Sequence, residues 1–116
     1  MNPAREETLM SFDAYRFAVE LVTLLRPLVA RVATHDPALA DQLRRAATSA
    51  PLNLAEGRRR VGRDRLHLWR IAAGSVAEVG AALEVSVAWG YLEGAETAEA
   101  VALCDRLGAI TWSLTR

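Results

Sequence analysis

The polar side chains best placed to do chemistry occur in two apolar stretches of the 116-residue chain. The first stretch, residues 39–60, carries four of them at steps of four, four and three residues, the spacing of one side of a helix. The second stretch, residues 71–92, carries two more, one helical turn apart. The six residues are Arg45, Ser49, Asn53, Glu56, Ser75 and Glu78. If the two helices pack together, Arg45 or Asn53 reaches Glu78, and Glu56 finds a donor on the other helix.

Three interpretations of these six polar residues are open. They form a buried network that satisfies its own polar groups and fixes helix register, they line a solvated edge, or they make a ligand or catalytic site. Two carboxylates can serve as acid and base. However, the sequence offers no nucleophile, no phosphate-binding loop, and no metal-ligand spacing among His35, His67 and Cys104. We favour the structural network and predict a protein that is not an enzyme and binds no cofactor or metal.

Arginine is concentrated in the middle of the chain. Residues 44–70 hold eight arginines and two acids, whereas residues 1–43 have a net charge of −2 and residues 71–116 a net charge of −4. All fourteen basic residues are arginine, whose planar fork pairs with phosphate. This arginine belt is either a surface for RNA or DNA, or a solvated segment that meets the acidic fourth helix of a neighbouring subunit. The belt consists of Arg44, Arg45, Arg58, Arg59, Arg60, Arg63, Arg65 and Arg70.

The composition favours packed helices in a single domain. The chain is 52% hydrophobic but only 6% aromatic, which suits helices better than a sheet. One small core does not absorb that many apolar residues, so some of them should line a subunit interface. No apolar run approaches the ~20 residues of a bilayer span, the N-terminus does not resemble a signal peptide, and the single Cys104 fits a reducing compartment. We expect a cytoplasmic protein with no membrane contact.

The first helix has more apolar surface than one bundle core needs. We predict a flexible tail over residues 1–10, an N-cap at Ser11, and a helix over residues 12–33 with Pro27 on its polar side. Two apolar stripes cover about half of its circumference. We assign the second stripe to an oligomer interface; the alternative is a well-buried helix in a monomer. The second stripe consists of Phe17, Leu21, Leu24 and Leu28.

Three further helices complete the all-α domain predicted over residues 11–116. Asp36 followed by Pro37 is a strong start signal for a helix over residues 37–59. Pro51 either kinks this helix or breaks it, and we favour a kink because the apolar period resumes in phase afterwards. Helices over residues 64–89 and 95–114 follow. Short links between four helices imply an up-down antiparallel four-helix bundle whose second helix is kinked at Pro51.

Three segments resemble the 23S rRNA intervening-sequence family of small bacterial proteins. They are SFDAYRFAVELV (11–22), QLRRAATSAPLNLAEG (42–57) and IAAGSVAEVGAALEVSVAWGYL (71–92). The most specific positions are Arg44-Arg45-Ala46, Ser49, Pro51, Asn53, Ala55-Glu56-Gly57, Gly74-Ser75 and Glu78. The chain departs from the family pattern in its shorter link between the first two helices and in its lack of a lysine-rich surface.

The resemblance implies a four-helix bundle that assembles as a homopentamer. It also implies kinship with the accessory proteins of diversity-generating retroelements, which bind nucleic acid and a reverse transcriptase. The combined hypothesis is a non-enzymatic homo-oligomer, favoured as a pentamer, whose arginine belt contacts RNA or DNA. The alternatives are a scaffold for a protein partner with no nucleic-acid role, and an accessory subunit of a retroelement reverse transcriptase.

Overall fold

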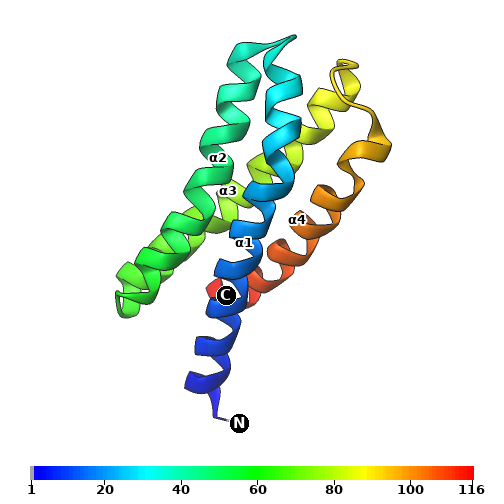
Figure 1. The fold of residues 1–116 in the computed structure, drawn as a ribbon. Coiled ribbons are helices and arrows are strands. Elements are labelled where there is room, and N and C mark those ends of the chain that lie inside the picture. The colour runs from blue at the N-terminus through cyan, green and yellow to red at the C-terminus, as the bar shows by residue number, and fades with distance from the viewer. Residues whose placement is uncertain (1) are drawn as a thin grey trace.

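The computed structural model describes residues 2–116, and within them the chain forms four helices joined by short turns. The helices are α1 (Pro3–Ala33), α2 (Pro37–Arg58), α3 (Gly62–Ala88) and α4 (Gly94–Thr115). Consecutive helices run in opposite directions, so the α1–α2 and α3–α4 turns lie at one end of the bundle (Figure 1). The α2–α3 turn and both ends of the chain lie at the other end (Figure 1). The predicted all-α four-helix bundle is confirmed.

The start of α1 was predicted wrongly. Asn2 is the N-cap, and its side chain accepts a hydrogen bond of 2.9 Å from the backbone N–H of Arg5. Pro3 follows at the first helical position, where its missing N–H costs nothing. Ser11 is buried inside the helix and donates its hydroxyl to the carbonyl of Thr8. Residues 3–10 are therefore helical instead of an irregular tail, and Met1 lies outside the described residues.

Both internal prolines lie within unbroken helices. Pro27 is exposed on α1, and Pro51 is buried in α2. The alternative in which α2 breaks into two helices at Pro51 is therefore wrong, while the degree of bending there stays a prediction. Asp36 caps α2 as predicted, accepting a hydrogen bond from the Leu39 N–H at 3.0 Å.

The buried face of α1 runs between the two predicted stripes. Its buried residues include Leu21 and Leu28, which are 0% and 6% exposed within the single chain. Their assignment to an oligomer interface is therefore wrong, because the bundle core already covers them. Phe17 and Leu24 are half-buried, and the guanidinium of Arg106 covers the Phe17 ring at 4.4 Å.

Helix α3 contains a long apolar segment that the rest of the chain covers only in part. By length and composition alone it is long and apolar enough to cross a membrane, with a mean hydropathy of 1.5 over an 18-residue window. The expectation that no apolar run approaches that length therefore fails at α3. Helices in bundle cores meet the same criterion, but only 33% of this window is buried within the chain. The remaining apolar surface includes Ile71 and Val85.

Candidate nucleic-acid interface and polar network

Three of the six predicted network residues are joined by hydrogen bonds across the α2–α3 contact. The Ser75 hydroxyl on α3 donates to the Ser49 hydroxyl oxygen on α2 at 2.8 Å. The Asn53 amide donates to the same oxygen at 3.0 Å and to the Ser49 carbonyl at 2.9 Å. Because these side chains are only partly exposed, the bonds fix which turn of α3 lies against which turn of α2.

The charged members of the predicted network lie elsewhere. Arg45 forms an ion pair with Asp41 one turn away, and Glu56 pairs with Arg60 at 2.9 Å. Glu78 is exposed on α3. The predicted contacts from Arg45 or Asn53 to Glu78 do not form, since partners on the same helix are closer. Glu56 and Glu78 therefore do not come together as a pair of carboxylates.

The arginine belt divides into two separate groups. Arg44 and Arg45 lie mid-way along α2 and share the carboxylate of Asp41, at 2.8 and 3.2 Å. Hydrogen bonds from Arg44 and then from Arg45 lower the pKa of Asp41. The next belt residue, Arg58, is thirteen positions after Arg45, about 20 Å along the helix axis. The belt is therefore not one continuous surface.

The second group is the turn between α2 and α3, here called the basic turn and comprising residues 58–65. Arg59 and Arg63 are exposed and form no ion pair among residues 2–116. Arg58 covers the ring of Phe12 at 5.3 Å, and Arg60 is held by Glu56. Arg70 lies outside the turn and donates to the Thr115 carbonyl at 3.4 Å.

Arg65 differs from its neighbours because it ties three elements together. Its Nε donates to the carbonyl of Gly57 at 3.1 Å and its Nη2 to the carbonyl of Arg58 at 3.0 Å. Its Nη1 reaches Glu7 on α1 at 3.2 Å, and its guanidinium covers Trp69 at 5.2 Å. The last carbonyls of a helix have no partner within the helix, so Arg65 caps α2. It is occupied structurally and is not free for phosphate.

Replacing Arg65 with glutamine should therefore lower the free energy of unfolding by about 1–2 kcal/mol, through lost bonds from a charged donor to helix-end carbonyls. Arg63→Gln removes the same charge from the same turn and should stay within about 0.5 kcal/mol of the parent chain. Urea unfolding followed by circular dichroism measures both variants. Equal effects of the two substitutions would contradict the capping role of Arg65.

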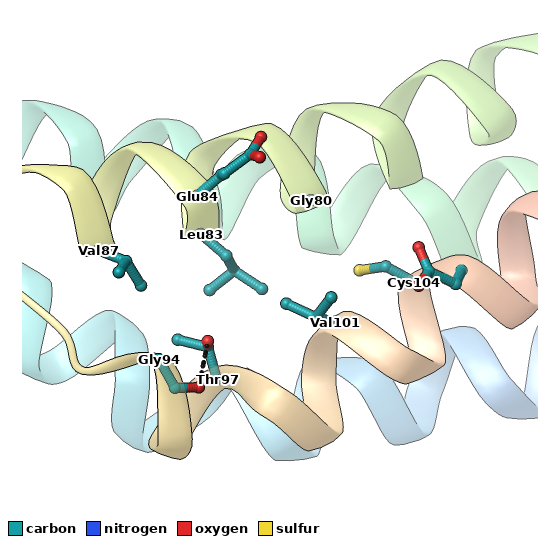
Figure 2. Close-up of a pocket in the computed structure, with 9 residues that line it drawn as sticks. Gly80, Leu83, Glu84, Val87, Gly94, Thr97, Val101 and Cys104 are labelled. Atoms are coloured by element: carbon teal, nitrogen blue, oxygen red, sulfur yellow. Dashed lines mark hydrogen bonds between the residues drawn. The ribbon is translucent and has the colours of Figure 1, made fainter.

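A groove lies between α3 and α4. It has a volume of about 390 Å³ and is lined by Leu83, Val87 and Val101, with Glu84 and Cys104 at its side (Figure 2). Desolvation, with a smaller contribution from Asp105, raises the pKa of the Cys104 thiol to about 11. The thiol is therefore protonated at neutral pH and is a weak nucleophile. Within residues 2–116, no three His, Cys, Asp or Glu side chains gather as metal ligands.

The family model described as 23S rRNA-intervening sequence protein matches residues 10–113, nearly the whole bundle. The chain belongs to this family. The matched residues include the hydrogen-bonded polar residues of α2 and α3. They also include the basic turn.

A solved structure supports the same fold for this chain. It is a protein with unknown function from the S23 ribosomal protein family of Bacteroides thetaiotaomicron, 16% identical in sequence. The similarity covers 89% of this chain and 98% of the other, with a TM-score of 0.81. At this identity the likeness shows the fold alone. No curated protein matches the chain.

Sequence reasoning missed two features of this site. The contact between Glu7 and Arg65 was hidden because residues 1–10 were assigned to a tail, although Asn2-Pro3 is a cap followed by a proline. The capping role of Arg65 has no sequence signature, because its targets are backbone carbonyls of residues 57 and 58. Only the docking of α3 on α2 reveals it.

Proposed function

We propose that this protein is a non-enzymatic, homo-oligomeric bundle that binds the phosphate backbone of RNA or DNA through the basic turn. The observation that carries the proposal is the pair Arg59 and Arg63. Both are exposed, both project from a turn at one end of the bundle, and neither has an ion-pair partner within residues 2–116. Guanidinium groups in this state can form bidentate bonds with phosphate without first breaking an internal ion pair.

The charge of one turn supports only weak binding. Residues 58–65 contain five arginines, and three acids lie in or beside the turn: Glu56, Asp64 and Glu7. The net charge of the turn is therefore about +2. A long polyanion that contacts several turns at once gains avidity, because each further contact is intramolecular. The proposed function therefore depends on assembly of several copies.

Exposed apolar side chains support assembly, but on surfaces other than the predicted α1 stripe. Large apolar side chains are exposed on α3 and α4, where the single chain leaves them in water. We propose that these surfaces join the copies and keep the pentamer as the favoured state. Light scattering at 500 mM salt should give a mass near five times 12.6 kDa, and a mass near 12.6 kDa would contradict assembly. The exposed residues on these two helices include Ile71, Val85, Val101 and Trp112.

Binding to a structured RNA and to duplex DNA across a salt series tests the phosphate contact. Each phosphate neutralised contributes about −0.9 to the slope of log K against log salt for duplex DNA. The double variant Arg59→Gln with Arg63→Gln should bind more weakly and lower the magnitude of that slope by about two. Fluorescence anisotropy with labelled nucleic acid measures both quantities.

The matched control removes two charges elsewhere. Arg16 and Arg26 are exposed on α1, outside the basic turn. The double variant Arg16→Gln with Arg26→Gln should keep the parent slope. Equal losses in both double variants would mean that only net charge matters. If the parent protein fails to bind nucleic acid even at 20 mM salt, the proposal is overturned. The alternative, a scaffold for a protein partner, would then be favoured.

A further inference from the structure

The end of the bundle opposite the basic turn carries a stack of three aromatic rings, here called the ring stack. Tyr91 stacks with two rings, with His35 at 5.2 Å between ring centroids and with Trp89 at 6.3 Å. The interplanar angles of 6° and 15° make the rings nearly parallel. They come from the α1–α2 and α3–α4 turns, which meet at that end (Figure 1).

Trp89 is 69% exposed, so much of its ring is open to solvent. Arginine covers most other aromatic rings of this chain, at 4.4–5.3 Å from the ring centroid. Within residues 2–116, Trp89 is the only tryptophan without such a guanidinium. A large exposed ring of this kind is a site for a cation, because the face of an indole attracts positive charge. The covered rings are Phe12, Phe17, Trp69 and Trp112.

The surroundings of the ring stack favour a cation over a nucleic acid. The Tyr91 hydroxyl donates to Asp36 at 3.4 Å, and Glu93 is exposed in the same turn as the ring stack. The one arginine nearby, Arg31, is already paired with Glu96. A phosphate backbone would be repelled by the carboxylates of Asp36 and Glu93, whereas an arginine would be attracted both by these two acids and by the exposed ring of Trp89.

The basic turn of a second copy has the matching chemistry. It offers Arg59 and Arg63, which have no ion-pair partner among residues 2–116, at the far end of a bundle 47 Å long. One chain cannot bring its own two ends together. We propose that copies associate end to end, with the basic turn of one copy seated on the ring stack of the next and an arginine lying over Trp89.

Such a contact joins two different surfaces, so it repeats and builds chains or closed rings of copies. It is separate from the lateral assembly proposed above and does not depend on nucleic-acid binding. Because both contacts use the basic turn, a bound polyanion should compete with end-to-end association.

Two variants, each defective at one end, test the contact. The turn variant carries Arg59→Glu and Arg63→Glu and keeps its ring stack. The ring variant carries Trp89→Ala and Glu93→Gln and keeps its basic turn. All four side chains are exposed, so both variants should retain the helical circular dichroism signal of the parent.

Sedimentation velocity at 50 mM salt gives the readout. The parent protein should grow in mass with concentration, and 500 mM salt should suppress that growth. Neither variant alone should grow, but an equimolar mixture should form a heavier species that contains both. Exchange of subunits between lateral oligomers leaves their mass unchanged. Exchange can therefore be distinguished from end-to-end association, which raises the mass. Leu52→Ala with Glu20→Gln changes an exposed apolar side chain and an exposed acid outside the basic turn, the ring stack and the proposed lateral surfaces, and this variant should behave as the parent does.

Two results would overturn the inference: a parent mass independent of concentration, or a mixture no heavier than its components. RNA binding by the ring variant separates this inference from the proposed function. If the ring variant binds RNA as the parent does while the mixture fails to associate, only the end-to-end contact is wrong. A Trp89→Phe variant, which keeps an aromatic ring at this position, should retain part of the association. Its affinity for end-to-end association should be within about fivefold of that of the parent.

Discussion

Replacing Gly57 with alanine is expected to lower the free energy of unfolding by about 2–4 kcal/mol, although alanine is the better helix former. A Cβ at this position would lie 2.4 Å from Nε1 and 2.5 Å from Cδ1 of Trp69. The indole cannot yield cheaply, because it is 2% exposed and donates Nε1–H to the Leu54 carbonyl at 3.4 Å. Moving it also disturbs the Arg65 guanidinium above the ring.

Gly74→Ala is the matched control for that substitution. Gly74 is exposed in α3, and a Cβ there has no atom within 4 Å. Alanine should therefore raise stability by up to about 1 kcal/mol, which is the usual gain over glycine in a helix. Urea unfolding of both variants measures the difference. A stabilised Gly57→Ala variant would show that α2 and α3 can move apart at little cost.

Replacing Leu21 with alanine should lower the free energy of unfolding by about 3 kcal/mol and leave the mass of the oligomer unchanged. Leu21 is fully enclosed within one chain, so truncating it leaves a cavity in the core. Leu24, one turn further along α1, is only half-buried, and Leu24→Ala should cost clearly less. Thermal unfolding and light scattering on the same samples give the two readouts.

The opposite pattern for Leu21→Ala would contradict this description of α1. If the variant dissociated into single chains while each chain kept its unfolding midpoint, the α1 stripe would be an interface after all. Retention of both mass and stability would mean that the core repacks around the smaller side chain. Neither outcome is expected for a side chain with no exposed surface.

Much of the fold could be predicted because helix signals are local. The apolar periods located all four helices, and Asp36-Pro37 fixed the start of α2. The phase of the buried face on α1 could not be predicted. Leu21 is in the second predicted stripe and Leu25 is not, yet both are buried, because α2 and α4 approach α1 from two directions. The positions of the neighbouring helices, and not the apolar periodicity of the sequence, determine which part of a wide apolar arc is buried in the core.

The candidate site was predictable in residue type and not in pairing. Ser49, Asn53 and Ser75 were expected to lie together, and hydrogen bonds join them. The spacing could not reveal that Arg45 pairs within α2 and Glu56 pairs with Arg60 in the adjoining basic turn, because pairs between residues close in sequence compete with contacts across helices on nearly equal terms. The ring stack could not be predicted, because His35 is far in sequence from Trp89 and Tyr91 and contacts Tyr91 only when the two turns pack together.

The order in which the helices contact one another also bears on how the chain folds. Three of the four main packing contacts join helices that are consecutive in the chain, and only the α1–α4 contact spans most of its length. Short loops close with little loss of entropy, so α1–α2 and α2–α3 can form as hairpins before the rest is in place. The contact between α1 and α4 closes the largest loop of the chain, so its formation costs the most loop-closure entropy. It should be the part of the bundle that opens first and exchanges its amide hydrogens most readily.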